Sequence, residues 1–360
     1  MKFLSSFGII FLLVISIKAN AKEQTFELVR QPRTMAMGGA GVGLADDEYA
    51  LFQNAAGLAG LEERGFRPVG IGVEGSWDTY TNLTDIMALK SNFSISSLDV
   101  FMNKDIAFRA GEAPMIILPH FALAYVFDTQ FAMNQYNKVN PNINLGYMTT
   151  HGLQVGTAWS FKEGRHPTDE FRIGVAAKLL FRKGGFYDIG TAGLLQSTSG
   201  GPEYLKSLVG NFGTGFGGDL GVQYIKKITP TETISFGSSL TDFGNTKFSD
   251  THAMTIPMTW NLGIGLKKML DQNKLSFDFD VRNVLLATSL SNKLHFGSEL
   301  DLGFITLQAG LNQLDPTYGI GFDAWVLKLM FLSYAEELAP SYHQLTSRRV
   351  MLSANFNMPI

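Results

Sequence analysis

Residues 275–282 read LSFDFDVR, and every second side chain in this stretch is apolar. The apolar positions are Leu275, Phe277, Phe279 and Val281, and the polar ones are Ser276, Asp278, Asp280 and Arg282. Successive side chains of a β-strand point to opposite faces of a sheet, so the pattern predicts a strand with one apolar and one charged face. A soluble sandwich does not bury such a charged face cheaply, whereas a membrane barrel turns it into a wet lumen.

The same alternation recurs along most of the chain. It is found in residues 153–161, 171–182, 258–266, 305–312 and 350–360. A tilted strand of about ten residues crosses a bilayer. The sequence therefore predicts an all-β fold, a transmembrane antiparallel β-barrel of about 14 strands.

Composition points to the same class. Charged residues are only 17% of the chain, and no apolar run after the first 21 residues approaches the roughly 20 residues of a spanning helix. Without spanning helices, a chain crosses a bilayer only as a closed barrel, because its backbone polar groups must all be paired. The formal net charge of −3 argues against a nucleic-acid partner.

An export signal is predicted at the N-terminus. Lys2 precedes an apolar stretch over 3–17, and Ala19-Asn20-Ala21 is a small-x-small cleavage pattern, so residues 1–21 are expected to be a signal peptide. The alternative, an uncleaved helix, is disfavoured by the short apolar run. Export without any cysteine suggests a bacterial envelope protein, here one of the outer membrane.

The spacing of the strands predicts two unlike ends. The connections 78–94, 183–212, 242–256 and 335–346 are long, whereas 163–169, 227–230 and 269–273 are short. Long extracellular loops and short periplasmic turns are typical of bacterial barrels. The stretch 78–117 stays open: it contains a strand near 95–109, or an amphipathic helix built on Leu83, Ile86, Met87 and Leu89 in a loop or plug.

Residues 33–61, RTMAMGGAGVGLADDEYALFQNAAGLAGL, fit no strand. Gly38, Gly39 and Gly41 permit a tight, bent backbone, and Asp46, Asp47 and Asn54 are costly in lipid, so a lumen suits the segment. A barrel of about 14 strands is wide enough to need filling or to conduct water. We therefore expect residues 22–65 to form a lumenal hatch and residues 66–360 to form the barrel.

The acidic pair has two interpretations. Asp46 and Asp47 are expected to anchor the hatch to wall arginines, and Arg172, Arg182 and Arg282 are candidates because their parity places them inward with Asp278 and Asp280. Alternatively the pair marks a helix N-terminus facing water, since it precedes Leu51, Ala55 and Leu58 at helical spacing.

This segment is similar to the N-terminal signature of the FadL-type outer-membrane transport family, including its PorV-like branch. That signature runs Met-Gly-Gly-Ala, then Ala-Asp-Asp, then Asn-Pro-Ala-Gly-Leu. Here the elements are Met37-Gly38-Gly39-Ala40, Ala45-Asp46-Asp47 and Asn54-Ala55-Ala56-Gly57-Leu58, with Ala55 in place of the proline. Residues 318–322, 332–335 and 347–350 are similar to the family's closing hairpin.

The resemblance implies a 14-stranded barrel whose N-terminus folds inward as a hatch. It also implies passive uptake of hydrophobic molecules such as long-chain fatty acids or aromatic hydrocarbons, often with exit through the wall. An apolar solute is poorly served by a water-filled pore or a polar outer leaflet. Met35 and Met37, and the loop residues Leu194, Leu195, Leu205 and Leu208, are possible ligand contacts, although ordinary packing explains them equally well.

The PorV-like branch implies a different function. Its members bind exported proteins at the outer face and serve secretion or surface attachment, with no solute transport. Long apolar outer loops serve either function, so the expected partners are membrane lipid, a hydrophobic small molecule and, in the alternative, an exported protein.

Nothing in the sequence favours an enzyme. It has no G-x-S-x-G elbow and no H-E-x-x-H helix, and its six histidines are scattered without ligand-like spacing. Asp278 and Asp280 share a strand face with Arg282, which indicates charge balance in a lumen rather than acid–base catalysis. Neither a cofactor nor a metal is expected.

Overall fold

The structure is a computed structural model that describes residues 27–62, 64–89, 102–135, 142–163, 166–190, 193, 207–339 and 344–359. The predicted signal peptide lies outside these residues.

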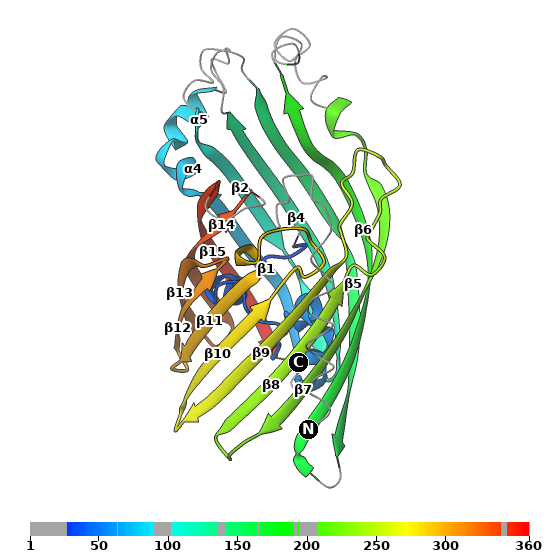
Figure 1. Cartoon of the computed structure of the whole chain (residues 1–360), viewed down its shortest axis with the longest axis vertical. Coiled ribbons are helices and arrows are strands. Elements are labelled where there is room, and N and C mark those ends of the chain that lie inside the picture. The colour runs from blue at the N-terminus through cyan, green and yellow to red at the C-terminus, as the bar shows by residue number, and fades with distance from the viewer. Residues whose placement is uncertain are drawn as a thin grey trace.

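The chain folds as a closed antiparallel β-barrel (Figure 1). Its strand segments are β1 Gly65–Ser76, β2 Asp105–Glu112, β3 Met115–Leu118, β4 Phe121–Gln135, β5 Ile143–Glu163, β6 His166–Ile189, β7 Gly213–Lys227, β8 Glu232–Thr241, β9 Thr259–Leu270, β10 Asn273–Val281, β11 Leu294–Asp301, β12 Ile305–Asn312, β13 Asp315–Ala324, β14 Leu327–Glu337 and β15 Thr346–Pro359. The pairing of β1 with β15 closes the ring. β2 and β3 lie in line between β1 and β4, so the 15 segments occupy 14 strand positions, as predicted.

The wall has the two faces that the alternation predicts. Phe277 and Phe279 are 36% and 43% exposed, whereas Asp278 and Asp280 between them are 1% and 0% exposed. Outward apolar side chains of this kind surround the barrel and face lipid. This is the fold of a bacterial outer-membrane protein. Separately, no helix among the described residues is long and apolar enough to cross a membrane.

The two ends of the barrel differ. At one end, the strands are joined by two to four residues, as at 228–231, 271–272 and 302–304. At the other end lie the long connections 77–104, 190–212 and 242–258. Bacterial barrels keep their short turns in the periplasm, and by this convention we name the end with the long connections the extracellular end and the other the periplasmic end.

The open stretch 78–117 contains both predicted kinds of structure, with shifted bounds. Helices α4 Trp77–Thr81 and α5 Leu83–Leu89 follow β1. The strand predicted near 95–109 begins instead at Asp105, and its continuation is broken at Ala113 and Pro114. Proline cannot donate to the ladder, so the strand divides into β2 and β3 there.

The wall is much taller on one side (Figure 1). β5 and β6 have 21 and 24 residues, whereas β11 and β12 have 8 each. Since about 9–11 tilted residues cross the bilayer, the extracellular halves of β5 and β6 rise beyond it.

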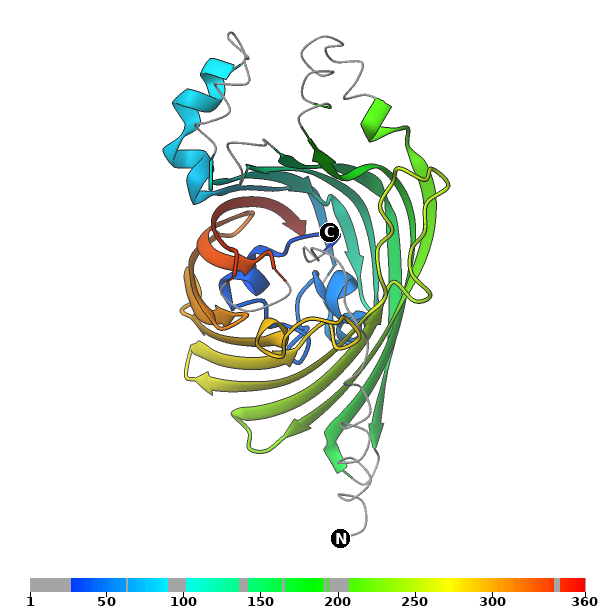
Figure 2. The same ribbon diagram turned by 45° about the horizontal axis from the view of Figure 1, so that its top comes forward.

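Residues 27–61, which we call the N-terminal segment, lie within the ring of strands (Figure 2). They contain α2 Pro32–Ala36, α3 Ala50–Gln53 and a 3₁₀-helix over Ala55–Gly60. Leu51, Ala55 and Leu58 are buried against small wall residues that include Ala122 and Ala158.

Candidate functional site

Inward-facing glycines of the wall form a seat for the N-terminal segment. A Cβ atom on Gly174 of β6 would lie under 3.0 Å from the backbone of Ala55, and one on Gly237 of β8 equally close to the carbonyl of Val42. A Cβ would lie equally close to backbone atoms of the segment at Gly221, Gly263, Gly297 and Gly310, on β7, β9, β11 and β12. At Gly156, Gly265 and Gly319, on β5, β9 and β13, it would lie under 3.0 Å from side chains of the segment. Only residues without a side chain permit this approach, so most of the wall is shaped to the segment.

Two wall carboxylates hold the glycine-rich loop of the segment. Asp280 Oδ2 accepts hydrogen bonds from the backbone N–H groups of Gly41 (2.8 Å) and Val42 (2.9 Å). Asp278 Oδ2 accepts one from the N–H of Leu44 (3.2 Å). These carboxylates therefore bind backbone donors of the segment, in addition to the charge balance that their spacing with Arg282 predicts.

The predicted pairing of Asp46 and Asp47 with wall arginines is wrong. Asp46 pairs with Arg33 (2.6 Å), which belongs to the segment itself, and with Lys267 of β9 (2.6 Å). Asp47 also pairs with Arg33 (3.1 Å), which in turn reaches Glu299 of β11 (2.7 Å). Burial raises the pKa of Asp46, but Arg33 and Lys267 outweigh burial and hold that pKa well below its usual range. The anchor therefore stays charged at neutral pH.

The three candidate arginines have other partners. Arg172 forms an ion pair with Glu170 (2.5 Å), and Arg182 donates a hydrogen bond to Thr150 (2.7 Å). Arg282 forms an ion pair with Glu27 (2.5 Å) and donates to the carbonyl of Gly39 (2.9 Å). Parity gives the inward face of a strand, but it does not give the position around the circumference. Arg282 still contacts the segment, although not through the acidic pair.

The predicted hatch glycines differ in what they do. Gly38 and Gly39 adopt φ angles of 68° and 81°, a left-handed backbone that favours glycine. Gly41 does not, but a Cβ there would meet the side chain of Gln53 at 2.7 Å. Asn54 Nδ2 donates to the carbonyls of Val42 (3.2 Å) and of Val222 in β7 (3.1 Å), so it joins two parts of the segment to the wall.

The residues predicted as possible ligand contacts lie in different parts of the molecule. Met35 and Met37 are buried against the wall, at 5% and 2% exposure, and pack in this conformation. Leu208 packs near the extracellular ends of β5 and β6. Leu194, Leu195 and Leu205 lie outside the described residues.

The acidic pair also shapes a local turn. Asp47 Oδ1 accepts a hydrogen bond from the N–H of Tyr49 (2.9 Å) just before α3.

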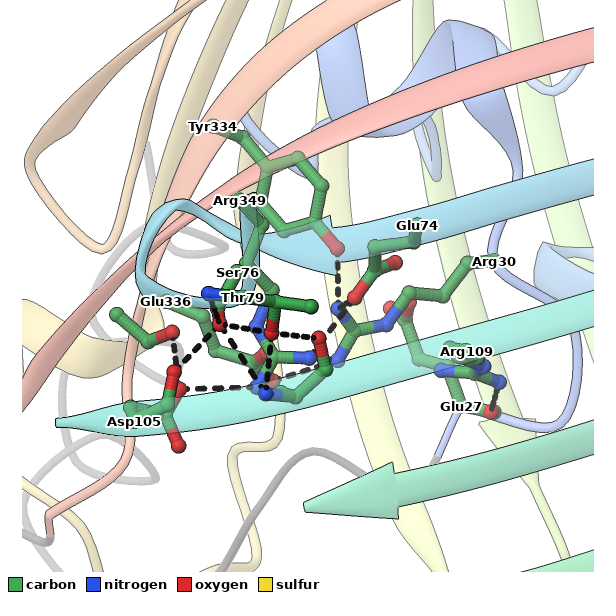
Figure 3. Close-up of polar contacts among 12 residues, drawn as sticks. Glu27, Arg30, Glu74, Ser76, Thr79, Asp105, Arg109, Tyr334, Glu336 and Arg349 are labelled. Carbon is green, nitrogen blue, oxygen red and sulfur yellow. Dashed lines mark hydrogen bonds and ion pairs between the residues drawn. The ribbon is translucent and has the colours of Figure 1, made fainter. Parts of the chain in front are cut away.

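A buried charge network joins the segment to the seam where the barrel closes (Figure 3). Arg30 pairs with Glu74 of β1 (2.9 Å) and Glu336 of β14 (2.7 Å), and it also hydrogen-bonds Tyr334. Arg349 of β15 pairs with the same two acids, at 2.8 and 3.3 Å. The side chains of Arg30, Glu74 and Glu336 are at most 5% exposed. One residue of the segment thus completes an ion network shared by three wall strands.

A second contact extends this network. Arg109 of β2 pairs with Asp128 of β4 (2.6 Å) and donates to the backbone carbonyl of Glu27 (2.6 Å). Neither cluster was predicted from the sequence. The available signal was an acid, Glu74, and a base, Arg109, at inward positions among small and apolar residues.

A cavity with a mixed polar and apolar lining lies on the extracellular side of the segment. Its volume is ≈ 70 Å³, and Leu28, Val29, Phe52 and Ile256 contribute its apolar lining. Two cations also line it, Lys178 and Arg282. An apolar cavity of about 150 Å³ is known to hold benzene, so this one is too small for an aromatic ring unless the lining moves.

Two further cavities flank the segment. One of ≈ 300 Å³ lies toward the periplasmic turns and has a strongly charged lining that includes Arg33, Asp46, Asp47, Glu48, Lys274, Glu299, Asp301, Asp323 and Lys328. The other, of ≈ 30 Å³, lies behind the break between β2 and β3, with Val29, Gly70, Gly111 and Ala113 in its lining.

Because the wall glycines lie so close to the segment, adding a single methyl group to one of them should have a steric effect. Gly174→Ala should place Cβ in the backbone of Ala55 and weaken docking of the segment by about 1–3 kcal/mol, the usual range for overpacking. Gly218→Ala is the matched control on the neighbouring strand, because its Cβ would meet nothing closer than 3.6 Å. Limited proteolysis from the periplasmic side should cut the first variant faster than the control; equal rates would contradict a fitted seat.

The closed wall of 14 strand positions, its apolar outer band and a lumen occupied by residues 27–61 define a class of protein, the outer-membrane barrels with a segment of their own chain in the lumen. Among solved structures, the fold is similar to the CymD monoaromatic hydrocarbon channel, at a TM-score of 0.50 and 12% identity over 91% of this chain and 97% of that one. It is also similar to the toluene transporter TbuX of Ralstonia pickettii, at 0.50 and 13% over 93% and 99%. At such identities the likeness is one of fold. No protein-family model and no curated protein sequence matches the chain.

Proposed function

We propose that this protein is a passive outer-membrane channel of the FadL type for small, neutral hydrophobic molecules, with the N-terminal segment as its hatch. The observation that carries the proposal is the cavity beside the segment seated in the lumen, where Leu28, Val29, Phe52 and Ile256 give the lining an apolar part. An apolar solute gains free energy on leaving water for such a lining, and that gain needs no coupled energy source. The two solved structures of similar fold are described as a hydrocarbon channel and a toluene transporter, which supports the same substrate class.

The charges around the cavity favour a neutral solute over a fatty acid. Lys178 pairs with Asp219 (2.9 Å) and Asp242 (3.0 Å), and Arg282 pairs with Glu27 (2.5 Å). Both cations in the described lining are thus already neutralised by protein acids. A fatty-acid carboxylate would have to displace one of these pairs, whereas a neutral ring would not.

Passage requires movement of the segment. The cavity of ≈ 70 Å³ must grow roughly twofold to hold a benzene-sized ring. Leu28 and Val29 belong to the segment and line the cavity, so their displacement enlarges it without opening the barrel wall. We therefore place the gate at the first residues of the segment.

The proposal includes an exit through the wall. A hydrocarbon leaving toward the periplasm would cross the ≈ 300 Å³ cavity with its charged walls, which is unfavourable. The smaller cavity behind Ala113 shares Leu28 and Val29 with the first one and lies beside the break in the strand between β2 and β3. Charged residues line it too, and they include the ion pairs of Arg30 with Glu74 and of Arg109 with Asp128. A sideways route through this break ends in the bilayer, which an apolar solute favours over the aqueous periplasm.

Whole cells test the proposal, because a lipopolysaccharide leaflet slows hydrocarbons and a simple phospholipid vesicle does not. Cells that lack their own hydrocarbon channels and express this protein should take up labelled toluene several-fold faster than cells with an empty vector. Leu28→Asp, which places a charge in the apolar lining, should abolish the gain, and Leu302→Asp in an exposed periplasmic turn should not.

Two outcomes would count against this function. Oleate uptake equal to or greater than toluene uptake would contradict the neutral substrate class. No uptake of either compound by correctly folded protein would contradict a channel and favour the secretion or surface-attachment alternative.

A further inference from the structure

The first extracellular connection contains an almost continuous helical stretch. α4 and α5 are separated by Asn82 alone, and the N–H of Asn82 donates to the carbonyl of Asp78 (3.2 Å). The N–H of Ile86 donates in turn to the carbonyl of Asn82 (3.0 Å). Residues 77–89 therefore act as one short helical ridge, and their side chains divide into faces at helical spacing.

One face of the ridge is fixed to the barrel. Asp78 accepts a hydrogen bond from the N–H of Asp105 (2.9 Å), and Thr79 Oγ1 donates to the carbonyl of Ala107 (2.9 Å). Both partners lie at the extracellular start of β2. Ile86, on the same side of the ridge, packs against the cluster that contains Ile106. The orientation of the ridge is thus set by the wall. On its other side, the side chains of Trp77, Tyr80, Leu83 and Met87 form no hydrogen bond to any other part of the described chain.

The opposite face is apolar and exposed. Trp77, Tyr80, Leu83 and Met87 are 58%, 48%, 49% and 62% exposed. Their spacing of three or four residues places them on one side of the ridge. Four large apolar side chains gathered in this way form a patch that calls for a partner.

The patch continues the lipid-facing surface of the barrel. On β1, Val69 and Ile71 point outward and are 40% and 43% exposed, and Gly75 has the same parity. The ring of Tyr80 lies 3.2–3.4 Å from the position of a Cβ on Gly75, so it covers the outer face of the strand at that point. The outward Phe108 of β2, paired with Gly75, is 43% exposed. No polar zone separates the outward side chains of β1 from the patch.

The height of the patch fits the membrane interface. β1 has 12 residues, and about 9–11 cross the hydrocarbon layer, so Trp77 follows where that layer ends. Tryptophan and tyrosine are the residues that favour this boundary, since their rings are apolar with one polar group.

We propose that the ridge over residues 77–89 lies in the outer leaflet of the membrane, with Trp77, Tyr80, Leu83 and Met87 among the lipid acyl chains. The occupant of this surface is lipid, because the patch is continuous with the lipid-facing wall and its fixed orientation turns it outward. The ridge is thus a membrane anchor beside the β1–β2 seam, in addition to the proposed transport.

Depth-dependent fluorescence quenching tests this proposal. The full chain carrying Trp159→Phe, Trp260→Phe and Trp325→Phe keeps Trp77 as its only tryptophan. In phosphatidylcholine vesicles brominated near the headgroup end of the acyl chains, Trp77 emission should be quenched several-fold more than in vesicles brominated near the chain ends. The matched control adds Trp77→Phe and Asp85→Trp, which moves the reporter to another face of the same ridge. That control should be quenched by aqueous acrylamide and only weakly by brominated lipid.

Two results would overturn the proposal. Strong acrylamide quenching of Trp77 with weak lipid quenching would place the ridge in water. Protection of Trp77 from both quenchers would mean that protein covers the patch. Heat-dependent gel migration confirms that each variant is a folded barrel, so either result is informative.

Discussion

Removal of residues 22–61 is expected to convert the protein into an open, ion-conducting pore. The wall closes through β1 and β15 without help from the segment, so the barrel should persist. The segment, however, occupies the lumen from the glycine seat to the charge network. A barrel of 14 strands without a filling encloses water, and conductance across a planar bilayer should rise by roughly tenfold or more.

A control shows whether the effect belongs to the segment. A synthetic peptide of residues 27–61 added to the deletion variant should lower the conductance again, because Asp278, Asp280 and the wall glycines remain in place to bind it. A folded deletion variant whose conductance matches that of the intact protein would show that the segment does not block the lumen.

Arg30→Met should destabilise the closed state by about 3–5 kcal/mol, the usual effect of removing one partner from a buried ion pair. Glu74 and Glu336 would then share Arg349 alone and leave a net negative charge at the closure seam. In single-channel recordings the variant should open far more often than the intact protein. Arg30→Lys should show a smaller effect, since it keeps the charge but cannot bridge both acids in the same way.

Two further variants isolate the charge effect. Arg64→Met removes an exposed arginine just before β1 and should leave gating unchanged. Arg30→Met combined with Glu336→Gln restores charge balance in the network and should recover part of the closed population. If Arg30→Met and Arg64→Met behave alike, the network does not hold the segment.

The wall was predictable because alternation is a local signal. Leu275 to Arg282 places its apolar and charged residues on opposite faces whatever the rest of the chain does, and the structure has that arrangement. The break between β2 and β3 was not predicted. Pro114 was visible in the sequence, but the loop before it gave no fixed starting point for the strand.

The contacts of the site were not predictable in the same way, because they depend on which strands of the barrel lie beside each part of the segment. Asp46 reaches Lys267 rather than Arg172 since the segment crosses β9 at that point, and parity carries no such information. Arg30 meets Glu74, Glu336 and Arg349 only because the barrel closes between β1 and β15. The wall glycines Gly174 and Gly237 were visible as small inward residues, but their close approach to the segment appears only in three dimensions.

Thiol labelling at Ala40 tests most directly whether a hydrophobic solute moves the segment. Ala40 is 0% exposed and the chain has no cysteine, so Ala40→Cys provides the only thiol. In cells, a membrane-impermeant maleimide should label it slowly, and toluene should raise the rate several-fold. A labelling rate that is the same with and without toluene, in a variant that still takes up toluene, would contradict a movable hatch.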